Sequence, residues 1–346
     1  MAFLRSIPRV AILLAVTASP GVGQVLEGPE GPVEFIGLER WKASALLEAI
    51  RETAPGQPLH ACSATMKYEL GFADAAVVGW VDADSPEDFL SGDLERYTVI
   101  IGIEDRARVR YRTVGTETVH LPESWQALKS VAEEDLRTLQ LATGMFHLRD
   151  DPESVRQRTE VFGLDTSGLP RVWTMIEAVD SEQDRLLAHA ILARDASWSS
   201  RAIAASVLVN FSDHDAAWHD LVSAAIDPED RVKGSAHGVL EAWIRAGESR
   251  AVRWDAARAQ LLAVLDGTSP YVFRTVLDVL AATASETTLA KQLIREAPDL
   301  LLAHVGAQHE ITRQPAIDLL KAVSGEDFGA DSEAWAEWLD GPLDDS

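Results

Sequence analysis

The second half of the chain carries apolar residues at helical spacing. One buried helical face needs apolar residues at positions i, i+3, i+4 and i+7. Four segments fit this template, and their first residues are Ala204, Ala236, Phe273 and Ala316. The complete quartets are Ala204, Val207, Leu208 and Phe211; Ala236, Val239, Leu240 and Trp243; Phe273, Val276, Leu277 and Leu280; and Ala316, Leu319, Leu320 and Val323. The steps between first residues are 32, 37 and 43, close to the period of about 31 to 47 residues for two-helix repeats.

Partner helices and helix starts fit between these quartets. A fifth quartet, made of Trp218, Leu221, Val222 and Ala225, precedes the one at Ala236. Asp227-Pro228 and Thr268-Ser269-Pro270 predict helix starts with an N-cap followed by proline, and Asp331 is expected to cap a last short helix. Each helix buries only one or two stripes, so neighbouring repeats have to stack.

The segment before residue 122 has a different pattern. Residues 38–53 have the spacing of an amphipathic helix, and residues 61–70 predict a second one. Three runs rich in β-branched and aromatic residues predict strands at 75–81, 97–103 and 108–114, the last two joined as a hairpin. We expect a small α+β domain over 24–121, with the first helix covering one face of its sheet.

The first 23 residues read as a secretory signal. Arg5 and Arg9 precede a short apolar stretch, and small residues follow up to Gly23, where we place cleavage. No other apolar run approaches the roughly 18 residues of a membrane span. The sequence therefore predicts an exported protein, periplasmic or secreted, that has no membrane span.

Acidic residues outnumber basic ones. The chain has 55 Asp and Glu against 31 Lys and Arg, a formal net charge of −24. Such a field repels phosphate backbones, so nucleic acid is not expected as a partner. Basic proteins or peptides remain possible partners, although net charge of this kind also serves solubility.

Several segments resemble a known repeat family. Residues 195–211, 227–243 and 311–325 are similar to second helices of HEAT-type repeats, with a capped start followed by Arg or Lys and a small-apolar face. Together with the Trp-containing ending, they resemble exported bacterial HEAT-repeat domain proteins that have no assigned activity. This resemblance implies a mainly α fold, with a HEAT-like α-α superhelix over 180–346 after a helical connector at 122–179.

Few residues suggest catalysis. Cys62 is the single cysteine, and His60 lies two positions before it, which leaves open an enzyme centred on the α+β domain. Asp215 and His219 would share a helix face but form a pair, too few for a usual metal site. We expect no metal and no other cofactor.

Exposed tryptophans are the candidates for binding a partner. Trp218 and Trp243 belong to the quartets and are expected in the core, which leaves Trp198, Trp254, Trp335 and Trp338 as candidate binding residues. Each of Arg201, Lys233 and Arg313 precedes a quartet by three residues, and these cations predict ion pairs with acids of neighbouring repeats.

The sequence thus favours a non-enzymatic binding or scaffold protein that presents a helical face to a protein or peptide. The enzyme at Cys62 and a purely structural component of the cell envelope remain the alternatives.

Overall fold

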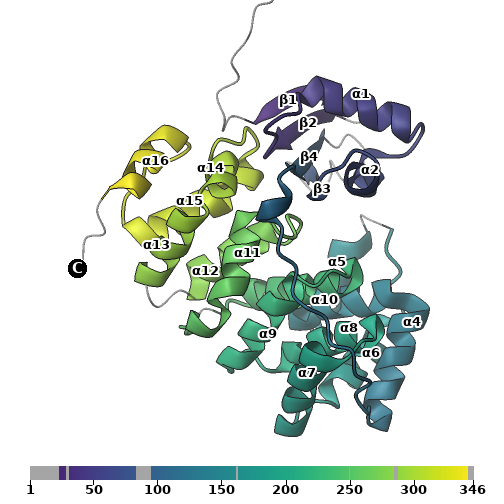
Figure 1. Ribbon diagram of the computed structural model, residues 1–346. Helices are drawn as coiled ribbons and strands as arrows, with labels where there is room; N and C mark the ends of the chain where they lie inside the picture. Colours follow the sequence, from purple (N-terminus) through teal and green to yellow (C-terminus); the bar gives the residue numbers. More distant parts are fainter. Residues whose placement is uncertain are drawn as a thin grey trace, which may run out of the picture.

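The computed structural model describes residues 23–28, 31–82, 95–160, 163–248, 250–283 and 287–341. Within these ranges the protein is mainly helical, with a small four-stranded sheet near its N-terminus (Figure 1). The expected fold class is confirmed at this level. Residues 1–22 of the predicted signal segment lie outside the described residues.

The sheet has the order β1-β2-β4-β3. Its strands are β1 (Gln24–Gly28), β2 (Gly31–Ile36), β3 (Asp74–Asp82) and β4 (Glu95–Ile103). β2 and β4 are parallel, while the other two pairs are antiparallel. The predicted strands at 75–81 and 97–103 are confirmed. Sequence analysis missed β1 and β2, where glycine, proline and glutamate dilute the strand signal.

Two helices cover one face of this sheet, and the first of them does so as predicted. α1 (Ala43–Thr53) and α2 (Cys62–Tyr68), with the short 3-10 turn η1 (Leu59–Ala61) between them, pack on it. Leu46 and Met66 share a buried cluster with Phe35 and Ile100 of the strands. The amphipathic face of residues 38–53 therefore closes a small core of its own.

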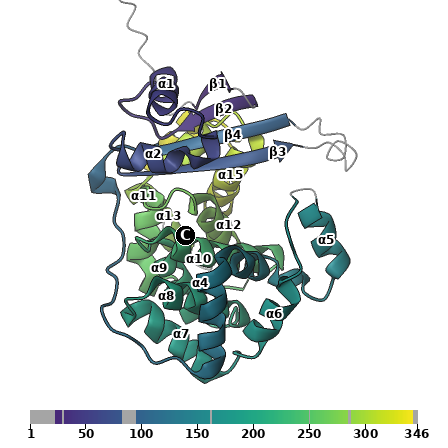
Figure 2. The ribbon, with the colours of Figure 1, turned by 90° about the vertical axis from the view of Figure 1, so that its right-hand side faces the viewer.

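The opposite face of the sheet packs on the helical part of the molecule (Figure 2). Val99, Ile101 and Ile103 alternate with Ile100 along β4, and they belong to the same buried cluster as the helices. β4 is therefore buried on both sides, which explains its nearly continuous apolar sequence.

The third predicted strand is not formed. After β4 comes the 3-10 turn η2 (Arg106–Arg108), and residues 109–121, here called the strap, run in irregular extended form along the helical part (Figures 1 and 2). Arg110 N donates to Thr268 Oγ1 at 2.8 Å, and Arg112 N donates to Ile226 O at 2.9 Å. The hairpin prediction is wrong because these backbone groups pair with loops between helices instead of with β4.

The helical part begins directly after the strap. Its helices are α4 (Glu123–Gly144), α5 (Pro152–Glu160), α6 (Leu169–Glu177), α7 (Glu182–Arg194), α8 (Trp198–Val207), α9 (Asp215–Ala225), α10 (Asp230–Arg245), α11 (Arg258–Asp266), α12 (Phe273–Thr283), α13 (Thr287–Glu296), α14 (Asp299–Val305), α15 (Glu310–Ser324) and α16 (Ser332–Asp340), with 3-10 turns η3 (Phe146–Leu148), η4 (Leu208–Asn210) and η5 (Asp255–Ala257). Consecutive helices pack as the pairs α7/α8, α9/α10, α11/α12 and α14/α15. The second members contact one another in the series α8, α10, α12 and α15.

The five apolar quartets are confirmed as core: every one of their residues is buried. The helix starts fit less well. α10 begins at Asp230, two residues after the predicted start at Pro228, and α12 begins at Phe273, three residues after the predicted start at Pro270. Asp227 is not the N-cap residue of α10, because its carboxylate binds Arg201 and Arg112. Asp331 does cap α16, as expected.

Candidate functional site

The sheet is joined to α15 through a buried carboxylate. Glu34 of β2 is fully buried and accepts hydrogen bonds from the backbone nitrogens of Gln308, at 2.5 Å, and His309, at 3.3 Å. Tyr97 of β4 donates its hydroxyl to the same carboxylate at 3.1 Å. The loop before α15 is thereby fixed against the sheet, and this contact shapes the surface beside it.

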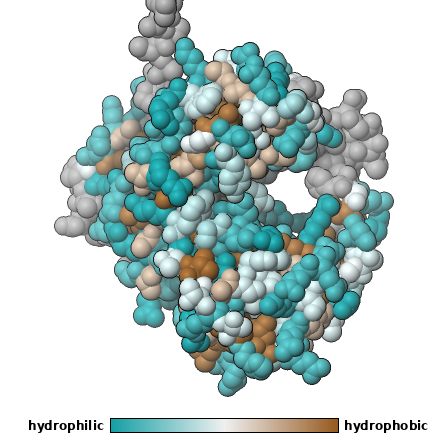
Figure 3. Space-filling view, turned by 45° about the vertical axis from the view of Figure 1, so that its right-hand side comes forward, coloured by the Kyte–Doolittle hydropathy of each residue, from teal (hydrophilic) through white to brown (hydrophobic). Residues whose placement is uncertain are grey.

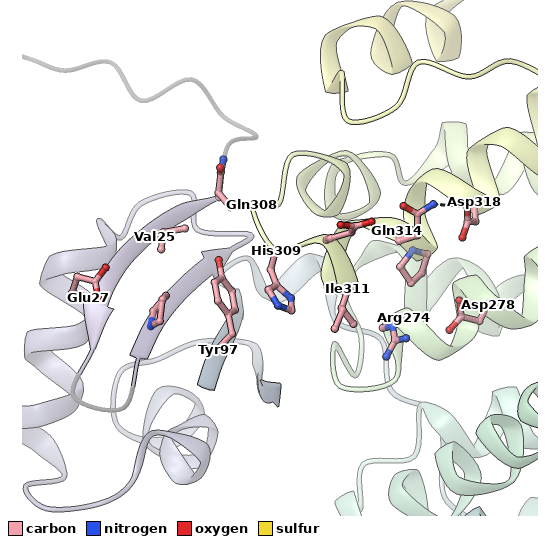
Figure 4. A pocket seen from close by; sticks show the side chains of 14 residues that line it. Val25, Glu27, Tyr97, Arg274, Asp278, Gln308, His309, Ile311, Gln314 and Asp318 are labelled. Carbon is pink, nitrogen blue, oxygen red and sulfur yellow. Dashed lines mark hydrogen bonds between the residues drawn. The ribbon is translucent and has the colours of Figure 1, made fainter. Parts of the chain in front are cut away.

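An open groove of about 1000 Å³ lies at this junction. It is bordered by β1, β2 and β4 on one side and by α12 and α15 on the other (Figure 4). Figure 4 shows Tyr97 and His309 facing Gln314 and Asp318 across it, with Ile311 and Arg274 between them. Segments from both ends of the described chain therefore build one surface.

The charge of the groove is mostly negative. Its lining has four carboxylates, from Glu27, Asp278, Glu310 and Asp318, against the single guanidinium of Arg274. Asp318 also accepts from the side-chain amide of Gln314 at 2.7 Å. Carboxylates gathered around a hollow attract cations more strongly than the same charges spread over a convex surface.

Aromatic rings line the sheet side. The Tyr97 and His309 rings stack with centroids 4.1 Å apart, and the Trp80 ring lies 6.5 Å from the His309 ring. The guanidinium of Arg274 lies over the Trp80 ring, 4.8 Å from its centroid. Burial, together with the negative charge of Glu34, raises the pKa of Tyr97, so this hydroxyl stays protonated and keeps donating at neutral pH.

Asp278 has the most perturbed carboxylate of the groove. Burial raises the pKa of Asp278 to about 6, helped by the nearby acids Asp318 and Glu241 and opposed by Arg274. A carboxylate in this state gains most from a cationic ligand, because the ligand would favour its charged form. The groove is therefore electrostatically suited to a positively charged group.

The four candidate tryptophans lie elsewhere. Trp254 and Trp335 are 3% and 0% exposed and form part of the core, so they do not offer a surface to a partner. Trp198 and Trp338 are half-buried, and each has a cation over its ring: Arg231 at 3.7 Å and Lys291 at 4.9 Å. The binding role of these two tryptophans stays a prediction.

Sequence analysis missed the groove because no single segment contains it. Arg274 and Asp278 lie one turn apart on α12, and Gln314 and Asp318 lie one turn apart on α15. Such i, i+4 polar pairs on helices that bury the opposite face were a usable signal. The sequence does not show that β1 and β4 lie opposite these pairs on α12 and α15.

Cys62 and His60, the pair on which the enzyme hypothesis rests, lack the features of a catalytic dyad. Cys62 is 1% exposed, and burial raises the pKa of its thiol to about 12. His60 is exposed in η1. A nucleophilic cysteine needs a lowered pKa and access to substrate, and Cys62 has neither.

The cluster considered for metal binding serves structure instead. Asp215 binds Arg250 and Arg253, while His219 Nε2 lies 2.7 Å from the carbonyl oxygen of Arg253. Asp220 pairs with His189. Across the described ranges, no three His, Cys, Asp or Glu side chains are grouped so that they could hold a metal ion.

The predicted inter-repeat ion pairs are present in one case of three. Arg201 of α8 binds Asp227 in the next repeat with 3.0 Å between Nε and Oδ2, and this pair is buried. Lys233 instead pairs with Asp230 of its own helix at 2.6 Å. Arg313 donates instead to the backbone oxygen of Gln308 at 2.7 Å.

Known proteins offer no guide to this site. No family model, curated protein or solved structure matches the chain. Within the described ranges, none of the helices combines the length and the hydropathy that crossing a bilayer requires.

Proposed function

We propose that the protein is a non-enzymatic binding or scaffold protein whose groove between the sheet and α12/α15 takes a basic segment of a partner protein. The observation that carries this proposal is the composition of the groove, four carboxylates to one guanidinium beside the stacked Tyr97 and His309 rings. Lysine and arginine side chains are attracted by both features, through ion pairs and through cation–π contacts.

We further propose that the helical part is a HEAT-like superhelix. The serial contacts of α8, α10, α12 and α15, and the pairing of each with the helix before it, support this assignment. In such an array the second helices share one face, and the polar pairs on α12 and α15 belong to that face. Repeat architectures commonly use an extended surface of this kind to hold a peptide.

The surface agrees with a polar mode of recognition. In Figure 3 hydrophilic residues cover most of the visible face, hydrophobic ones form small separate patches, and the face is hollowed where the sheet meets the helices. Among the residues that the structure describes, the large exposed apolar side chains are Val25, Tyr68, Leu186 and Tyr271. A partner held by such a surface would depend on charge more than on apolar burial.

Peptide binding by the purified protein tests the function. A lysine-rich peptide and a glutamate-rich peptide of equal length are titrated by fluorescence anisotropy, and only the lysine-rich one should bind. The double variant Glu310→Gln/Asp318→Asn should weaken its affinity several-fold, since exposed ion pairs contribute roughly 0.2–1 kcal/mol each. Added salt should weaken it further.

The control removes the same charge from another place. Glu134→Gln/Asp150→Asn changes two exposed carboxylates outside the groove lining. An equal loss of affinity in both double variants would mean that the peptide responds to net charge alone, and the groove would not be its site.

Export is a separate part of the proposal. It is supported by the arginines, apolar stretch and small residues at the start of the sequence. Determination of the N-terminal residue of the protein recovered from outside the cytoplasm tests it: a start near Gln24 is expected, and an intact Met1 would contradict it.

A further inference from the structure

Behind the groove lies a second, smaller hollow, here called the inner cavity. It measures about 220 Å³ and lies between the helix-facing side of strands β3 and β4 and the helices α10, α12, α14 and α15. Its sheet wall is apolar, with Val78, Val99 and Ile101. Sites for drug-sized ligands measure roughly 300–1000 Å³, so the inner cavity has room for something smaller, such as one large side chain.

Arg274 is the one residue that lines both hollows. Its guanidinium lies on the Trp80 ring, 4.8 Å from the centroid, and therefore at the border between the groove and the inner cavity. No ion pair joins Arg274 to any carboxylate of the described residues, and its buried Nε has no hydrogen-bond partner among them. The buried Nε1 of Trp80 has none either. In a chain of net charge −24, a guanidinium that forms no ion pair with these acids is available to a ligand.

The nearest acids do not take this role. Glu241, which also lines the inner cavity, accepts a hydrogen bond from Arg245 on its Oε1 at 2.6 Å. Asp278, one turn along α12, lies near enough for the charge of Arg274 to oppose the rise in its pKa, but no ion pair joins these two residues. A planar guanidinium with free nitrogens matches a carboxylate, which can accept two parallel hydrogen bonds from it.

We infer that the groove reads the C-terminus of its basic partner: Arg274 binds the terminal α-carboxylate, the last side chain enters the inner cavity, and the preceding basic residues contact the acidic rim. This inference rests on the proposed function, since it assigns a direction and an end to the peptide in the groove. The apolar sheet wall and the Tyr271 ring favour an aromatic or large aliphatic last residue.

The test compares one lysine-containing peptide ending in phenylalanine in two forms, with a free C-terminal carboxylate and with a C-terminal amide. The free acid should bind roughly tenfold to a hundredfold more tightly, the range for charged hydrogen bonds to an arginine. Replacing the last phenylalanine by glycine should weaken binding of the free acid as well.

The variant Arg274→Gln should remove the preference for the free acid over the amide. The matched control Arg171→Gln, an exposed arginine on α6, should keep the preference. Because the two peptide forms are compared on the wild-type protein, the test holds even if Arg274→Gln does not fold.

Each outcome bears on one claim. Equal affinity of the acid and the amide, or an undiminished preference in Arg274→Gln, would overturn the C-terminal assignment while the groove remained a basic-peptide site. No binding of either form would overturn the proposed function itself.

Discussion

Arg112 of the strap and Asp227, in the loop between α9 and α10, form a buried ion pair with 3.0 Å between Nε and Oδ2. Arg201 of α8 donates to the same carboxylate, and Arg112 also donates to the backbone oxygen of Leu192 in α7. One carboxylate therefore joins the strap to two successive helix pairs. The strap is held by charge and hydrogen bonds in the place where strand pairing was expected.

The first prediction concerns this pair. Arg112→Ala should lower the free energy of unfolding by about 3 kcal/mol, the lower end of the range for a broken buried pair, because Arg201 still partners Asp227. Arg110→Ala is the control: Arg110 is half-exposed and binds Asp266 at 2.7 Å, so its removal should cost about 1 kcal/mol or less. Urea denaturation measures both, and equal losses would mean that burial does not strengthen the Arg112 pair.

The second prediction tests the register of the repeats. Leu240 is fully buried in α10, so Leu240→Ala should cost about 2–5 kcal/mol through the cavity that it leaves. Its neighbour Glu241 pairs at the surface with Arg245, and Glu241→Ala should change stability by roughly 0.5 kcal/mol. Chemical denaturation gives both values, and two equally mild variants would contradict the assignment of this helical face.

The third prediction follows from Asp278. Its folded-state pKa of about 6 lies above the ordinary value of 3.8, so its contribution to stability is fully present below pH 4 and is lost as the pH rises through 6. Asp278→Asn should therefore be more stable relative to the wild type at pH 7 than at pH 4. Urea midpoints at both pH values measure this difference. Parallel pH dependence in the two proteins would show that Asp278 titrates normally.

The fourth prediction concerns Cys62. Because burial raises the pKa of its thiol to about 12, the folded protein should resist alkylation at pH 8 and react only after denaturation. Mass spectrometry after iodoacetamide treatment, with and without guanidinium chloride, counts the modified thiol. Rapid labelling of the folded protein would revive the enzyme hypothesis centred on Cys62 and His60.

Some features of the candidate site could be predicted from the sequence, and others depended on the tertiary structure. Sequence charge left a basic partner possible, and the groove gathers four carboxylates around one guanidinium. The residues were predicted less well, because an exposed tryptophan and a core tryptophan look alike when only one helix is considered. Trp254 packs against Trp218 of α9 in the core, a contact that no local pattern contains.

The sequence by itself determined the buried helical faces, the strands β3 and β4 and the helix that covers them. These features are local: a period of 3.6 or 2 residues decides which side chains leave water, whatever the rest of the chain does. Tertiary structure alone decided the strap, the strands β1 and β2 and the groove. Arg112 lies 115 positions from Asp227, and Glu34 lies 275 from His309. Pairings over such separations depend on how whole elements pack, so they cannot be inferred from a run of neighbouring residues.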